Sequence, residues 1–271
     1  MSQGFIEATL RGFTAAISKA LVSETAASQP GLLQTLDPRV RVLGLFTLVA
    51  AVVLSRRISV IAGLFAIAVL MATASRVRVV VLAKRVWLIV LGFSGLIALP
   101  AVFVTPGQPI FRMPWLPLAV TAQGLRGATR LVLRAETAAT LTTVLALSTP
   151  WAHLLKALRS LHLPAEVVTM LAMTHRYVFL LVETAGQMFE SRQSRTVGAL
   201  PGREQRRMAA RTAGVLLTKS IELSHQVFLA MRSRGFRGEV PLLQDLRMKA
   251  HDYLGLMVLV LIAGVAVWIG R

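Results

Sequence analysis

Residues 253–268 of the sequence read YLGLMVLVLIAGVAVW, an apolar run that contains no charged side chain. About 20 predominantly apolar residues span a bilayer as a helix, and this run comes close to that length. Charged and titratable residues stand on both sides of it, namely Arg247, Lys249, His251, Asp252 and Arg271. The sequence therefore predicts a membrane-spanning helix within these bounds.

The composition of the whole chain agrees with a membrane location. The 271 residues are 55% hydrophobic and only 15% charged, and the mean hydropathy is +0.66. Soluble domains carry about 25% charged residues, so this chain lacks the polar surface needed to cover its apolar residues. Cysteine is absent, which excludes disulfides and cysteine-ligated metals. We predict an all-α, polytopic integral membrane protein.

Four earlier stretches repeat the apolar pattern. Asp37-Pro38 opens the first, because an Asp side chain caps free backbone donors and proline at the first helical position loses no hydrogen bond. Arg39 and Arg41 follow, and their long stems can carry the charges to the interface. The predicted spans are 42–54, extended back through these two arginines, then 58–74, 86–104 and 118–149. The proline-rich residues 105–118 are expected to form an extracytoplasmic loop.

The excess of basic residues fixes the expected orientation. Thirty Lys and Arg against 12 Asp and Glu give a net charge of +18, and cytoplasmic loops of membrane proteins are rich in Lys and Arg. Five crossings with a cytoplasmic amino terminus place the basic segments 75–85 and 150–249 inside. Arg56 and Arg57 then fall outside, in a turn so short that we accept this exception.

The fourth predicted span carries a stripe of basic residues. Arg126, Arg130 and Arg134 recur at every fourth position, with Glu136 nearby. Charges at membrane depth usually face a protein interior or a wet cavity, so this stripe is expected to point inward. The alternative is a helix that begins only near Leu131.

Residues 150–249 differ from the rest of the chain. They contain 15 Lys and Arg and 7 Asp and Glu, a net charge of +8. A short amphipathic helix is predicted over 150–163, and two long helices are predicted over 165–195 and 203–234, with a turn at 198–202. Charged residues recur often enough in the first long helix to argue against a membrane span. We expect a long helical hairpin at the cytoplasmic face.

Both long helices end in the same way. The first ends in Ser194-Arg195-Thr196 and the second in Ser233-Arg234-Gly235, with Arg192 and Arg232 just upstream. A cation is favoured at a helix carboxy terminus, and an arginine fork binds carboxylates bidentately. Single arginines end many helices, but the repetition at two paired helices favours docking onto another protein.

These residues resemble the T, or CbiQ-type, transmembrane component of energy-coupling factor (ECF) transporters, which belong to the ABC importers. The resemblance runs from Leu36-Asp37-Pro38-Arg39 through His175-Arg176-Tyr177 to Ala230-Met231-Arg232-Ser233-Arg234-Gly235-Phe236, and so covers most of the chain. The last stretch is the most specific, whereas Leu-Asp-Pro-Arg alone is a weak signal.

The resemblance implies a non-catalytic subunit that joins a substrate-binding membrane (S, CbiM-like) component to two cytoplasmic ATPases, for uptake of cobalt or nickel ions across the inner (cytoplasmic) membrane. It also allows a small accessory membrane subunit. ATPase docking is carried over to the X-Arg-X motifs, Ser194-Arg195-Thr196 and Ser233-Arg234-Gly235. The upstream arginines Arg192 and Arg232 are included in this docking set, Arg192 because the first motif departs from the family pattern. The residue pattern divides the chain into an amino-terminal segment 1–35, a membrane domain 36–149, a coupling domain 150–249 and a final span 250–271. The segment 1–35 is either a short amphipathic helix at the membrane surface or a loosely packed leader with no separate role.

The residues themselves are compatible with a coupling role. The chain has no Gly-x-x-x-x-Gly-Lys-Ser/Thr loop for ATP phosphates. Its five histidines do not pair at helical spacing, so we expect neither a cofactor nor a metal site. One alternative is a stand-alone permease or channel that uses the arginine stripe as its path. Nucleic-acid binding is disfavoured, because the basic region has few aromatic side chains for stacking bases.

Overall fold

A computed structural model of the chain describes residues 12, 31, 33–77, 79–106, 108–112, 119–195, 201–236 and 248–271. The amphipathic helix expected within residues 1–35 lies almost entirely outside these residues. The described chain is helical, apart from one small two-stranded sheet, which confirms the all-α class. It divides into two compact units: residues 25–157 with 246–271, here the bundle unit, and residues 158–245 with 1–24, here the hairpin unit.

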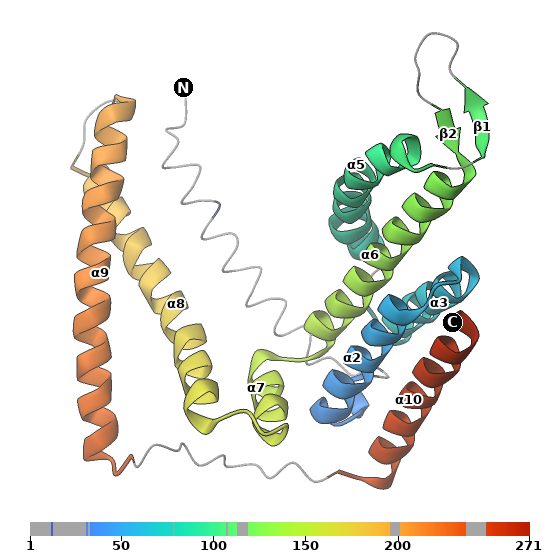
Figure 1. Cartoon of the computed structure of the whole chain (residues 1–271). Coiled ribbons are helices and arrows are strands. Elements are labelled where there is room, and N and C mark those ends of the chain that lie inside the picture. Colours follow the sequence, from blue (N-terminus) through green and yellow to red (C-terminus); the bar gives the residue numbers. More distant parts are fainter. Residues whose placement is uncertain are drawn as a thin grey trace. The chain divides into compact units, whose positions relative to one another are not determined.

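The bundle unit holds the predicted membrane helices (Figure 1). Its long helices are α2 (Pro38–Leu54), α3 (Ile58–Ala74), α5 (Leu88–Val104), α6 (Ala122–Ser148) and α10 (Ala250–Gly270). Short elements lie between or before them: the 3₁₀ turn η1 (Leu33–Thr35), α4 (Val79–Leu82), the π-helical turn η2 (Ala83–Trp87), β1 (Pro109–Arg112) and β2 (Ala119–Thr121). α7 (Trp151–Ser160) follows α6 and continues beyond the boundary of the unit.

Asp37 caps α2 as the sequence predicts. Its side chain accepts a hydrogen bond from the Arg39 N–H at 2.9 Å, and Pro38 occupies the first turn, where it loses no helical hydrogen bond. α2 ends at Leu54 and α3 begins at Ile58, so the two helices are joined by the short turn that the sequence indicates.

The start of the fourth predicted span differs from the prediction. α6 begins at Ala122 rather than at 118, because residues 119–121 pair with 109–112 as an antiparallel β-hairpin. The sheet extends from the ends of α5 and α6 (Figure 1). α6 is nevertheless continuous through the arginine stripe, so the alternative start near Leu131 is wrong.

Among the residues that the structure describes, three helices are long and apolar enough to cross a membrane: α6, α10 and residues Ala165–Ser191 of the hairpin unit. α3 and α5 are apolar but shorter. Together with its family, described below, these helices make the chain a multi-pass membrane protein. The expectation that charged residues exclude residues 165–195 as a span was too strict. The apolar side chains between those charges keep the hydropathy of the segment high.

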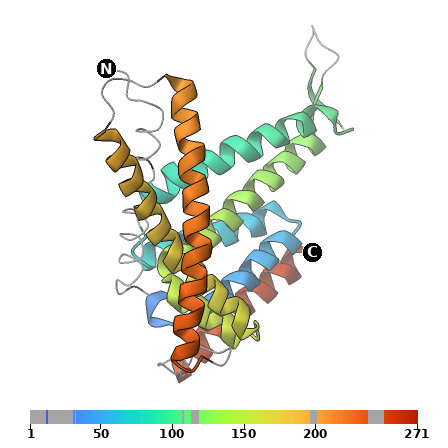
Figure 2. The same ribbon diagram turned by 90° about the vertical axis from the view of Figure 1, so that its left-hand side faces the viewer.

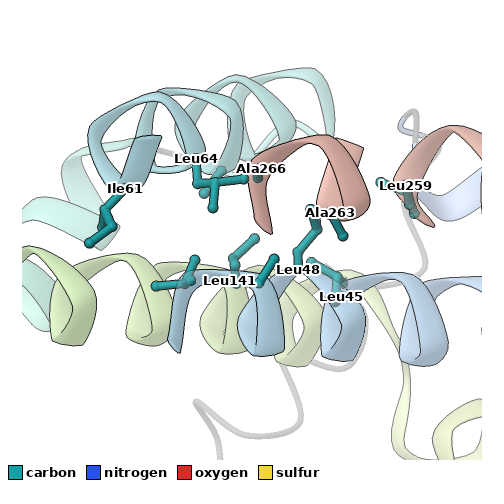
Figure 3. Close-up of a cluster of buried hydrophobic side chains, with 11 residues drawn as sticks. Leu45, Leu48, Ile61, Leu64, Leu141, Leu259, Ala263 and Ala266 are labelled. Carbon is teal, nitrogen blue, oxygen red and sulfur yellow. The ribbon is translucent and has the colours of Figure 1, made fainter. Parts of the chain in front are cut away.

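The core of the bundle unit is formed by side chains from four helices (Figure 3). α6 packs against α5, α3 and α2, and α10 packs against α2. In both views α10, drawn red, runs alongside α2, drawn blue (Figure 1, Figure 2). The labelled core residues are Leu45, Leu48, Ile61, Leu64, Leu141, Leu259, Ala263 and Ala266. Their burial joins the first, second, fourth and last predicted spans in one bundle.

A glycine allows α6 to begin close against α5. A Cβ on Gly124 would lie 2.7 Å from the carbonyl oxygen of Ala101 and 2.8 Å from that of Val102. Backbone atoms inside a helix cannot move away from such a clash as a flexible side chain can. The α5–α6 contact therefore requires glycine at this position.

The hairpin unit contains the two long helices α8 (Ala165–Gln193) and α9 (Gly202–Ser233). At 1.5 Å per residue they extend about 43 and 48 Å. Pro164 precedes the first and Pro201 precedes the second, and proline is well tolerated at helix starts because its missing N–H has no helical acceptor there. The helices run in opposite directions and are inclined to each other in both views (Figure 1, Figure 2). The predicted hairpin is thus present, with boundaries within two residues of those expected.

Candidate docking site on the two long helices

The carboxy end of α9 is closed by a glycine turn that leaves an arginine exposed. Gly235 has φ +81°, in the left-handed region that glycine adopts without strain. Its N–H donates to the Arg232 carbonyl at 3.0 Å, and the Phe236 N–H donates back to Met231 at 3.0 Å. This is a Schellman-type end, which satisfies the last carbonyls of the helix. The side chain of Arg234 is exposed at this turn.

The carboxy end of α8 also presents an arginine to solvent. The Ser194 N–H donates to the Glu190 carbonyl at 3.0 Å, and its hydroxyl donates to the Ser191 carbonyl at 2.9 Å. The side chains of Ser194 and Arg195 are exposed. Thr196, the third residue of the predicted motif, lies outside the described residues. Arg192 is in the last turn of α8.

Arg232 is placed differently from Arg234. Its guanidinium carbon lies 6.0 Å from the centre of the Phe228 ring, one helical turn earlier. A cation over an aromatic face within about 6 Å is attracted to the ring. Both arginines are exposed, but this contact directs the Arg232 guanidinium toward its own helix, whereas Arg234 lies in the turn beyond the helix. Of the two arginines near this end, Arg234 is therefore the better placed to bind a partner.

An apolar groove lies between α8 and α9. Its volume is about 610 Å³, and its wall includes the end of the Schellman turn, because Phe236 and Met231 both line it. The other lining residues are Glu166, Thr169, Met170, Met173, Thr174, Tyr177, Val178, Leu181, Ser220, Leu223, Ser224, Val227 and Phe228. This groove is not among the features predicted from the sequence. The methionines and aromatic residues at helical spacing in both helices are the signal that could have indicated it.

The arginine stripe of α6 has a structural partner. Arg134 donates a hydrogen bond to the backbone carbonyl of Ser55, in the α2–α3 turn. The Ser55 hydroxyl in turn donates to the Ala51 carbonyl at 2.7 Å and lies 3.4 Å from the Ala266 carbonyl of α10. One member of the stripe thus joins three helices of the bundle. Arg126 at the other end of the stripe is exposed.

Glu136 is the buried acid of the same helix. Its side chain is 6% exposed, and within the described part of the chain neither carboxylate oxygen has a hydrogen-bond partner. A cavity of about 510 Å³ lies beside it, lined also by Phe65 and Trp87. Among the described residues no group of three or more His, Asp or Glu side chains is arranged to hold a metal ion.

The sequence was compared with known proteins and families. The family profile described as CbiQ, cobalt transport protein, matches residues 30–243. An uncharacterised protein of Methanocaldococcus jannaschii, MJ1571, is 30% identical over 244 residues, which are 89% of this chain and 84% of that protein. The cobalt transport protein CbiQ of Rhodobacter capsulatus is 29% identical over 167 residues, 61% of this chain and 68% of the relative. Because the profile covers most of the chain, this helical membrane protein belongs to the CbiQ family of cobalt transport proteins.

Proposed function

We propose that this chain is the transmembrane coupling (T) component of an ECF-type ABC importer. In this role it has no catalytic activity of its own. It transmits movement from two cytoplasmic ATPases to a substrate-binding membrane component and so drives uptake of cobalt, or of nickel. The observation that carries the proposal is the pair of exposed arginines, Arg195 and Arg234, at the ends of two helices more than 40 Å long.

The chemistry of the two helix ends suits docking. A guanidinium at a helix carboxy terminus complements the partial negative charge of the last carbonyls. Its donors remain available to a carboxylate on a partner, and such charge-assisted bonds are stronger than neutral ones. Small neighbours, Ser194, Ser233 and Gly235, leave room for a groove of the partner to close around each arginine.

A mechanism follows from this arrangement. When the ATPases close on ATP, they move the two arginine-tipped helix ends relative to each other. The long helices carry this movement to the bundle unit, whose helices tilt and change their contact with the substrate-binding component. In this assembly the hairpin unit lies at the cytoplasmic face of the cytoplasmic membrane, and the amino terminus lies in the cytoplasm.

The apolar surface of α8 fits the same role. Met170 and Val178 are exposed on it, and α8 is apolar enough to cross a membrane by composition. We propose that it lies along the cytoplasmic surface of the membrane, with this side covered by lipid and by the substrate-binding component.

The decisive experiment reverses both docking charges. The variant R195E/R234E should insert into the membrane at the wild-type level and lose co-purification with the ATPases in mild detergent. The matched control is R203E/R211E, which makes the same charge change at exposed positions of α9. ATPase binding that survives the first variant, or that is lost equally in the control, would show that the assignment is wrong.

The stand-alone permease is tested by reconstitution. The chain alone in liposomes should transport no Co²⁺, whereas a permease would show flux without ATPases. One member of the arginine stripe, Arg134, is engaged by the Ser55 carbonyl, which favours a structural role for that residue over a place in a substrate path.

A further inference from the structure

The chain passes between the bundle unit and the hairpin unit at two connections after residue 148. On the bundle side of the first connection α6 ends at Ser148 and is followed by α7, and on the bundle side of the second connection α10 begins at Ala250. Both of these points lie beside the start of α2, where a set of buried polar groups joins them. We call Asp37, Arg41, Ser148 and Asp252 the root junction.

Arg41 is the centre of the root junction. Its side chain is only 4% exposed, and its guanidinium donates to three carbonyl groups. Nε donates to Leu36 at 2.9 Å, and Nη2 donates to Leu36 at 2.7 Å and to Gln34 at 2.8 Å. Nη1 donates to the Ser148 carbonyl at 2.7 Å. One side chain therefore ties the last residue of α6 to the segment before α2.

Asp252 makes the corresponding connection for α10. It is 3% exposed, and each carboxylate oxygen accepts one backbone hydrogen bond. Oδ1 accepts from the Asp37 N–H at 2.8 Å, across 215 residues of sequence, and Oδ2 accepts from the Lys249 N–H at 2.8 Å. The first bond ties the start of α10 to the cap of α2. The second caps α10 itself.

The geometry of these bonds makes the junction rigid. The guanidinium is planar and holds its donors in a fixed fork, so its acceptors cannot move independently without losing a bond. A buried polar group left without its partner is costly, and more so when it is charged. Small displacements of the two connections are therefore resisted together.

We propose that the root junction is the joint through which movement of the hairpin unit reaches α6 and α10 as one displacement, with Arg41 and Asp252 as its positioning residues. This inference rests on the proposed coupling function. Without the junction, the end of α6 at Ser148 and the start of α10 after Lys249 would move separately. The ATPases would then hydrolyse ATP without driving the bundle.

The first test measures transport per ATP in the reconstituted complex. The variant R41M should assemble with the ATPases and retain ATP hydrolysis, while Co²⁺ taken up per ATP falls about tenfold, within the range that residues of a coupling network produce. R41K should show nearly the same loss of Co²⁺ uptake per ATP as R41M, because an ammonium lacks the planar fork of donors that a guanidinium has. D252N should cause a smaller loss, because an amide still accepts one of the two bonds. The control is R57M, which removes an exposed arginine from the turn at the other end of α2.

The second test needs no ATPase. The chain has no cysteine, so A152C/A250C places spin labels on exposed positions of α7 and α10 without any background labelling. The full-length protein should give one narrow distance distribution, and adding R41M or D252N should broaden it. If R41M fails to fold, D252N supplies the result in both tests.

The outcomes separate the two proposals. Coupling ratios and distance distributions that equal those of R57M in both variants would overturn the role of the junction. Equal losses of hydrolysis and uptake would also overturn it, since these would indicate a merely structural role. If the wild-type chain binds no ATPase, the proposed function fails, and the distance measurement alone then judges whether the junction holds the two connections together.

Discussion

The bundle unit and the hairpin unit differ in how far their side chains are buried and paired within the chain. In the bundle unit, apolar side chains from four helices bury one another, and buried polar groups such as Arg41 and Asp252 have partners within the chain. In α8 and α9, among the side chains that the structure describes, only Val168 and Thr212 are buried. The bundle therefore has a closed core of its own, although large apolar side chains such as Phe93 and Trp268 are exposed on its outside. The hairpin has two amphipathic helices whose apolar surfaces are largely uncovered by the described chain.

This difference predicts where a substitution acts: on stability in the bundle unit and on assembly in the hairpin unit.

The single docking variants R195A and R234A should each weaken ATPase binding by about 1.5–3 kcal/mol, the range for a hydrogen bond to a charged group, and each less than the double reversal. The unfolding midpoint of the detergent-solubilised protein should not change. Binding is measured by titrating the ATPases onto the immobilised protein. A large fall in the midpoint would show that the arginines belong to the fold.

The variant G124A should destabilise the bundle unit by about 1–3 kcal/mol, as overpacking does, because its Cβ meets two backbone carbonyls of α5. Thermal unfolding followed by circular dichroism gives the effect. G127A, on the same helix, and G214A, on α9, are controls with no atom within 4 Å of the added Cβ. These should gain up to about 1 kcal/mol from helix propensity.

The variant G235A should cost about 1–2 kcal/mol, the strain of a left-handed conformation for a residue with a Cβ. The strain is local to the end of α9, so we expect weaker ATPase binding with an unchanged bundle. G202A, at the start of α9, has open space around its Cβ and is the control. If G235A binds the ATPases as tightly as the wild type, the Schellman turn does not orient Arg234.

The variant E136Q should stabilise the bundle unit by about 1 kcal/mol, because a buried carboxylate without a hydrogen-bond partner is costly and an amide of the same shape carries no charge. Unfolding in detergent measures the change. A loss of stability instead would mean that the carboxylate is engaged in the folded protein.

The smallest effect concerns His153 in α7. Partial burial, followed by the charges of Lys156 and Arg41, lowers the pKa of His153, against an opposing influence of Asp37. A lowered pKa means that folding favours the neutral ring. The contribution of His153 to the stability of the protein is therefore fully present above about pH 6.5 and is lost as the pH falls through the folded pKa. The unfolding midpoint of the wild type should therefore fall more between pH 7.5 and pH 5 than that of H153Q. Equal falls would contradict this.

Much of the bundle unit could be predicted from local sequence. Apolar runs gave the helices, because a span must be apolar along its length, and Asp37-Pro38 predicted a cap that depends only on adjacent residues. The β-hairpin could not be predicted in the same way, since its strands pair across a proline-rich stretch with no alternating pattern. The contacts within the root junction could not be predicted from local sequence either. In the sequence, Asp252 is one of several charges that flank the last span. Nothing local connects it with its partner Asp37, which is 215 residues away.

The candidate docking site shows the same limit. The two arginine motifs could be found because each is a short local pattern at a helix end. The groove between α8 and α9 depends on how two helices are inclined to each other, which the spacing of Met170 or Phe228 does not specify. The hydropathy of α8 was underestimated for a related reason. Counting its charged residues leaves out the apolar side chains between them, which raise the mean hydropathy of the segment.

The uncovered apolar sides of α8 and α9 also have a consequence for the life of the protein in the cell. In the proposed assembly, a copy that has bound its partners hides these surfaces, while an unassembled copy exposes them to chaperones and proteases. Exposed hydrophobic surface of this kind leads to aggregation or degradation. On the proposed function, the steady-state amount of this subunit should therefore follow the supply of the proteins that cover the hairpin unit.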